Sequence, residues 1–212
     1  MKRIRCLPAL LAAVLLMGCA AHEAEPAASA GTGGTDERVG LAAGSMSSAR
    51  TEQDSRDLSD AEVLAAYERA AAAYGWFRRA TLPGGEPSVT ADGQEFQPVE
   101  YAGIGTVEEL RTYLRGLFSA AVVDRLLPEG GSELYRDIDG VLHVCPTAWD
   151  RDAGKGRVSM MVERRSAVSY SVNVTVELLD DDRGTVTGVE CYAFPYEWNE
   201  GRWVFTDFDL VN

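Results

Sequence analysis

The stretch from Val168 to Leu178 constrains the fold of this chain more than any other. Its apolar residues are Val168, Tyr170, Val172, Val174, Val176 and Leu178, and the residues between them are polar or charged. Successive side chains of a β-strand point to opposite faces, so this alternation predicts a strand with one buried face and one face in water. An antiparallel sheet that is covered on one side contains strands of this kind.

Turn residues predict further strands around this one. Asp139-Gly140 separates the apolar runs 134–138 and 141–144, and such a pair favours the two-residue turn of a β-hairpin. Asp180 to Gly184 and Asn199 to Gly201 are turn-like in the same way. We therefore expect one continuous antiparallel meander with strands at 134–138, 141–144, 157–164, 168–178, 185–198 and 202–211. A further extended segment is expected at 96–101.

The first half of the ordered region has helical periodicity instead. Ser59 and Glu62 form an S-x-x-E capping box before a helix that we expect to reach Arg79. Thr106 predicts a second helix at 107–118, and Ser119 a third at 120–127. The aromatic stripe of the first helix could pack on the sheet or line a ligand pocket.

Helices followed by antiparallel strands indicate an α+β fold, with the N-terminal helices packed on one face of a curved antiparallel sheet. This arrangement is cystatin-like or NTF2-like in style. Residues 58–212 have the length of a single domain, and they contain no internal repeat.

The N-terminus predicts a lipoprotein signal peptide over residues 1–18. Three basic residues precede a short apolar run that ends in Leu16-Met17-Gly18-Cys19. We expect cleavage before Cys19 and lipidation, including palmitate, of its side chain, so that the protein is anchored to the cell membrane on the extracytoplasmic face. Residues 19–57 are rich in Ala, Gly, Ser and Glu and lack aromatic residues over 20–57, which predicts a disordered tether.

The net charge limits the partners. Residues 1–18 carry three positive charges and no negative ones, so their removal changes the formal net charge from −13 to −16. Nucleic acid is bound through Lys and Arg, so we expect no nucleic-acid partner. The acidity fits a basic protein partner, or it serves only to keep an exported monomer in solution.

Cys145 and Cys191 are the only cysteines left once Cys6 is removed and Cys19 is lipidated. Outside the cytoplasm such a pair can oxidise, so we predict a disulfide between them. Two buried free thiols are one alternative, and a reactive Cys145 assisted by His143 is the other.

The sequence contains no recognisable catalytic centre, and we expect no metal or cofactor. The ordered region has one histidine, His143, and lacks the C-x-x-C, H-E-x-x-H and G-x-S-x-G motifs. The longest irregular stretch in the sheet region is Pro146 to Gly156. It contains Trp149, Asp150, Arg151 and Asp152, and we interpret these four residues as a partner-binding loop. Alternatively, Trp149 folds back over the end of the sheet.

The ordered region resembles the IseA family of secreted bacterial inhibitors of cell-wall DL-endopeptidases. The similarity lies in Ala72-Tyr74-Gly75-Trp76-Phe77, in the run from Thr106 to Ser119 after Tyr101, in Leu134-Tyr135 before Asp139-Gly140-Val141-Leu142, and in Gly201-Arg202-Trp203 with Phe205 and Phe208. The resemblance implies that the domain binds and restrains a peptidoglycan hydrolase. The alternative from a different class is an NTF2-like pocket that holds a small ligand or performs weak acid–base chemistry with Tyr101, Tyr170 or His143.

Overall fold

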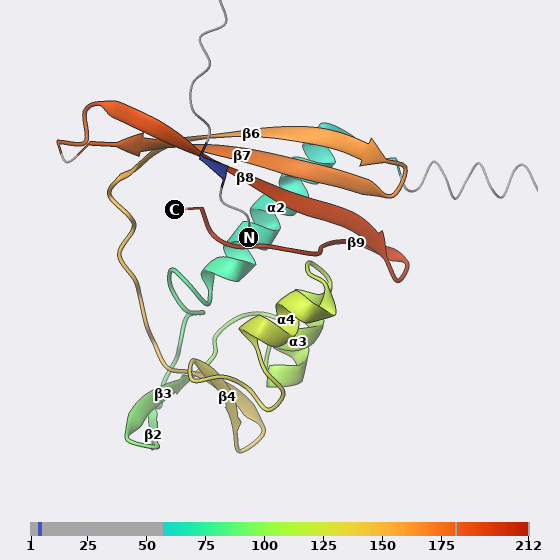
Figure 1. Cartoon of the computed structure of the whole chain (residues 1–212). Helices are drawn as coiled ribbons and strands as arrows, with labels where there is room; N and C mark the ends of the chain where they lie inside the picture. The colour runs from blue at the N-terminus through green and yellow to red at the C-terminus, as the bar shows by residue number, and fades with distance from the viewer. Residues whose placement is uncertain (1–3, 6–56, 181, 212) are drawn as a thin grey trace, which may run out of the picture.

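The computed structural model describes residues 4–5, 57–180 and 182–211 (Figure 1). Within them it contains three helices and two antiparallel sheets, one of which is strongly curved. The predicted α+β class, with helices packed on a curved antiparallel sheet, is confirmed. The predicted lipidation site Cys19 and nearly all of the predicted signal peptide and tether lie outside the described residues.

Helix α2 (Asp60–Gly75) begins as its capping box predicts. The Glu62 amide donates to Ser59 Oγ at 3.3 Å, and the Ser59 amide donates to Glu62 Oε2 at 2.8 Å. The helix ends at Gly75, short of the predicted Arg79. The amides of Arg79 and Ala80 both turn back to the Gly75 carbonyl, at 2.8 and 3.1 Å, and so close the helix with a tight turn.

Helices α3 (Val107–Arg115) and α4 (Ala120–Leu126) follow each other directly. Thr106 caps α3 through its hydroxyl, which accepts from the Glu109 amide at 3.1 Å. The buried Arg111 joins the two helices, because its guanidinium donates to Asp124 Oδ1 at 2.8 Å and to the Leu127 carbonyl at 2.6 Å. This one side chain fixes α4 against α3.

The large sheet has the order β1-β8-β7-β6, with β9 also paired to β8. Its strands are β6 (Lys155–Ser166), β7 (Ser169–Leu179), β8 (Val186–Asn199), β9 (Arg202–Phe205) and β1 (Ile4–Arg5), which falls within the predicted signal peptide. The alternation in β7 appears as predicted, since Tyr170, Val172, Val174 and Val176 are buried. Val168 differs, because it lies in the turn before β7 and is exposed.

The hairpin around Asp139-Gly140 belongs to a second, four-stranded sheet and not to the meander. Both turn residues have positive φ, +53° and +79°, as a tight hairpin turn requires. The strands are β2 (Val89–Ala91), β3 (Gln94–Pro98), β5 (Val141–Val144) and β4 (Tyr135–Ile138), in the order β2-β3-β5-β4. The prediction of one continuous sheet from residue 134 onward is therefore wrong, because β5 pairs with β3 through Gln97 and Val144.

Aromatic rings from α2 and the large sheet form the centre of the core. Phe208 packs on Phe194 and Phe205, with ring centroids 4.9 and 5.2 Å apart, and on Tyr67 and Tyr74 of α2. The predicted last strand is shorter than expected, since β9 ends at Phe205 and the chain then leaves the sheet to bury Phe208. The aromatic residues of α2 are thus core residues, as the packing interpretation predicts. None of the helices that the structure describes is both long and apolar enough to span a membrane.

Candidate functional site

The predicted binding loop is the connection between the two sheets. Residues 145–154 run from the end of β5 in the small sheet to the start of β6 in the large sheet (Figure 1). We call them the crossing segment. Lys155 and Gly156, which we expected in the loop, are the first residues of β6.

The first half of the crossing segment is fixed by backbone hydrogen bonds to the residues after α2. The Thr81 amide donates to the Thr147 carbonyl at 3.0 Å, and the Trp149 amide donates to the Arg79 carbonyl at 2.9 Å. Ala80 and Ala148 form an antiparallel bridge between these bonds. The backbone that carries Trp149 is therefore held like a short strand.

The side chains that follow this anchor lie at the surface. Trp149 is 39% exposed, and Asp150, Arg151 and Asp152 are all exposed. Asp152 shapes the turn into β6, since its carboxylate accepts from the Gly154 amide at 2.9 Å. The four predicted binding residues are thus adjacent, and the first of them, Trp149, lies on a hydrogen-bonded backbone. An exposed indole beside two carboxylates is suited to recognition of a protein surface.

A polar cluster of the large sheet lies where the crossing segment ends and β6 begins. Lys155 forms an ion pair with Glu190 of β8, and the Tyr192 hydroxyl donates to the same carboxylate at 2.5 Å. Burial by itself lowers the pKa of Lys155, but the hydrogen bond to Glu190 and the nearby charges outweigh it, so the pKa is raised. Lys155 is therefore a protonated partner in an ion pair, which makes it a structural residue and a poor nucleophile.

The two cysteines are free thiols, so the predicted disulfide is wrong. Cys145 follows β5 in the small sheet, whereas Cys191 lies within β8 of the large sheet. The Cys191 sulfur faces the hydroxyl of Thr175 at 4.0 Å, on the neighbouring strand. The prediction rested on these two residues being the only cysteines left in an exported domain, which does not determine whether they meet in the fold.

The residues of the alternative pocket lie on separate elements. The Tyr170 hydroxyl donates to the Leu58 carbonyl at 3.1 Å and accepts from the Leu58 amide at 3.0 Å, which fixes the chain before α2. His143 is buried in β5, with Nδ1 2.8 Å from the Val141 carbonyl oxygen. Tyr101 is exposed and packs against Trp76 at a centroid distance of 5.2 Å. Tyr170 thus has a structural role, and it belongs to a different sheet from His143.

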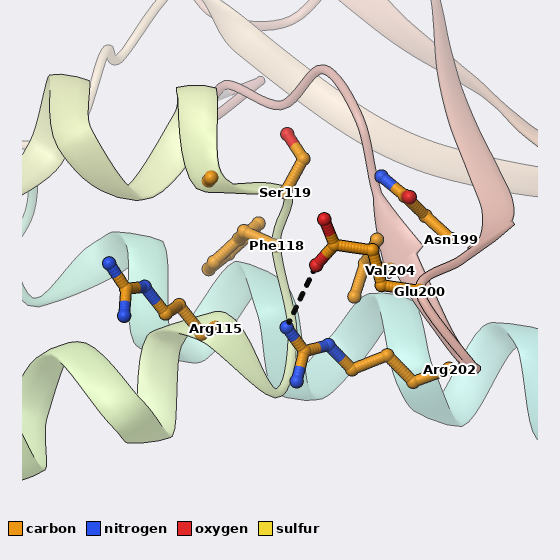
Figure 2. Close-up of a pocket in the computed structure, with 8 residues that line it drawn as sticks. Arg115, Phe118, Ser119, Asn199, Glu200, Arg202 and Val204 are labelled. Carbon is orange, nitrogen blue, oxygen red and sulfur yellow. Dashed lines mark ion pairs between the residues drawn. The ribbon is translucent and has the colours of Figure 1, made fainter.

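A cleft that we did not expect from the sequence lies between the end of α3 and the β8–β9 turn (Figure 2). Its volume is about 290 Å³. Arg115 is the last residue of α3, and Ser119 directly precedes α4. Asn199 ends β8, Glu200 lies in the β8–β9 turn, and Arg202 begins β9. Figure 2 shows Arg115 and Arg202 on either side of the buried Phe118. We call this hollow the Arg115–Arg202 cleft.

The Arg115–Arg202 cleft is cationic in a chain whose net charge is −13. Arg202 approaches Glu200 at 3.8 Å, and Arg115 has no ion pair with any residue in the described part of the chain. The Ser119 hydroxyl donates weakly to the Thr206 carbonyl at 3.5 Å. No periodicity or short motif signals this cleft, because its two arginines are far apart in the sequence.

Metal-ligating side chains do not cluster in either region. Among residues 4–5, 57–180 and 182–211, no group of three or more His, Cys, Asp or Glu side chains is placed to hold a metal ion. Both regions offer surface and charge for binding. In comparisons with known proteins, no family model and no curated protein matches the chain.

Proposed function

We propose that this chain is a lipid-anchored extracytoplasmic protein whose folded domain binds and restrains a cell-wall DL-endopeptidase. The class of target enzyme rests on the resemblance to the IseA family. The location at the membrane rests on the apolar N-terminal run that ends in Leu16-Met17-Gly18-Cys19. The structural support is the crossing segment: an exposed Trp149 on a backbone that is fixed to residues 79–81.

The mode of binding follows from these features. Trp149 is the anchor that enters the substrate cleft of the enzyme, and Asp150 and Asp152 face positive charge at its rim. Because the backbone at residues 147–149 is already hydrogen-bonded, little conformational entropy is lost when the segment docks.

The test is a turbidity assay of peptidoglycan lysis with a purified DL-endopeptidase and the soluble domain from Leu58 onward. We expect lysis to slow as the domain is added in stoichiometric excess. Tyr101→Ala is the matched control for Trp149→Ala, because Tyr101 has the same 39% exposure as Trp149 but lies outside the crossing segment. Unchanged lysis with several such enzymes would overturn the proposal.

A further inference from the structure

We propose that the Arg115–Arg202 cleft is a binding site for a small carboxylate ligand. This inference does not rest on the proposed function, because the cleft and the crossing segment share no residue. In Figure 1 the β8–β9 turn and the crossing segment also lie at opposite sides of the molecule.

The first observation is the state of Arg115. It is half-buried at the last position of α3, where the helix dipole favours a cation. The nearby acidic side chains Glu108 and Asp124 both pair with Arg111, at 4.0 and 2.8 Å. Arg115 therefore forms no ion pair with a carboxylate of the described residues, although its side chain also borders the hollow between α3 and α4 that Glu108, Asp124 and Glu129 line.

The second observation is that Glu200 already approaches the second arginine. Its carboxylate lies 3.8 Å from Arg202, longer than a charge-assisted hydrogen bond. The Glu200 side chain is 80% exposed, so it can be displaced at little cost. We infer that Glu200 occupies the Arg202 side of the cleft loosely, and that an incoming carboxylate replaces it.

The remaining lining defines the ligand class. Phe118 and Val204 supply apolar surface, and Ser119 and Asn199 supply a hydroxyl and an amide. A volume of about 290 Å³ is at the lower end for ligand pockets, so it fits a small acid or the terminal group of a peptide. The net charge of −13 repels polyanions, which favours a carboxylate over a nucleic-acid phosphate chain.

The experiment titrates the purified full chain with defined probes by calorimetry, and follows the amide resonances of Ser119, Asn199 and Gly201 by NMR. The probes are glutarate, N-acetyl-diglycine with a free carboxylate, its C-terminal amide, and inorganic phosphate. We expect one or both carboxylates to bind and to shift these resonances, and the neutral amide to have no effect. Glutarate tests a free diacid and N-acetyl-diglycine tests a peptide terminus, so their relative affinity distinguishes the two sources.

Substitutions connect binding to the two arginines. Arg115→Gln and Arg202→Gln should each weaken carboxylate binding roughly tenfold, because each removes one charge-assisted contact. Glu200→Gln should strengthen binding a few-fold by removing the internal competitor. Arg165→Gln is the matched control, since its side chain is 49% exposed like that of Arg202 and lies on β6, and it should leave affinity unchanged.

Three outcomes would overturn the inference. They are the absence of carboxylate binding at millimolar concentrations, equal binding of the amide, and unchanged affinity in Arg115→Gln. Phosphate binding that matches or exceeds that of the carboxylates would overturn the assignment to carboxylates. An unfolded Arg115→Gln variant is recognised by its NMR spectrum, and Arg202→Gln and Glu200→Gln, both at exposed positions, then carry the test.

Discussion

The crossing segment and the Arg115–Arg202 cleft, the two surfaces that we propose for binding, are opposite in character. The crossing segment projects an exposed indole and two carboxylates from a contiguous stretch of chain. The cleft is concave and cationic, and it is assembled from a helix end and a hairpin turn. An acidic domain thus presents two carboxylates where we propose that it meets a protein, and two arginines in a hollow of small volume.

Each surface also depends on a different buried residue. Arg111 holds α4 against α3 behind the cleft, while the Tyr135 hydroxyl accepts from the Leu82 amide at 2.8 Å and donates to the Trp76 carbonyl at 3.0 Å. Tyr135 therefore fixes residues 76–82, to which the crossing segment is bonded. Mutations at these two positions should separate the two surfaces.

The largest effect is expected from Arg111→Ala. It leaves the Leu127 carbonyl without its donor and removes a buried side chain, so the free energy of unfolding should fall by about 3 kcal/mol in urea denaturation. Asp124→Asn is the control and should cost less than about 1 kcal/mol, since Asp124 is 61% exposed. If Arg111→Ala weakens enzyme inhibition as strongly as carboxylate binding, the two surfaces are not independent.

Trp149→Ala should weaken inhibition of the endopeptidase roughly thirty-fold, which corresponds to loss of about 2 kcal/mol from a buried aromatic anchor. Folding stability should change little, because the side chain is already exposed in the free domain. Titration of the enzyme with wild type and variant measures the difference. Equal inhibition constants would show that Trp149 is not the anchor.

Tyr135→Phe should lower the free energy of unfolding by about 1 to 2 kcal/mol, because the buried Leu82 amide loses its acceptor. Hydrogen exchange should speed up at the Thr81 and Trp149 amides, which join the crossing segment to residues 79–81. The Ser119 amide beside the cleft bonds to the Phe205 carbonyl and serves as the internal control. Faster exchange at Ser119 alone would contradict the assignment of Tyr135 to the crossing segment and not to the cleft.

The smallest effect is expected from the double variant Asp150→Asn, Asp152→Asn. Charges at a rim act mainly on association, so binding to the enzyme should slow a few-fold at low ionic strength and be unaffected at high salt. Glu95→Gln with Glu133→Gln removes two exposed charges elsewhere and controls for the change in net charge. A salt-independent change in dissociation rate would assign the aspartates a direct buried contact instead.

The features that could be predicted from the sequence are local ones. The capping residues Ser59 and Thr106, the Asp139-Gly140 turn and the alternation in β7 each depend on residues that are close in the chain. The crossing segment was predicted for the same reason, since Trp149 and its charged neighbours are consecutive.

The features that could not be predicted depend on distant pairings. The split into two sheets follows from β3 pairing with β5, and the cleft follows from α3 meeting the β8–β9 turn. Burial of Phe208 ends the last strand early, because the aromatic core is more favourable for that side chain than the sheet surface. The alternation of a strand fixes its buried face but does not identify its neighbours.

The most direct test of the proposed function is steady-state kinetics of a DL-endopeptidase on a soluble stem-peptide substrate, with increasing amounts of the domain from Leu58 onward. If the crossing segment occupies the substrate cleft, the apparent KM should rise linearly with the concentration of free domain while kcat stays constant. A fall in kcat with KM unchanged, or no inhibition with several such enzymes, would contradict the account.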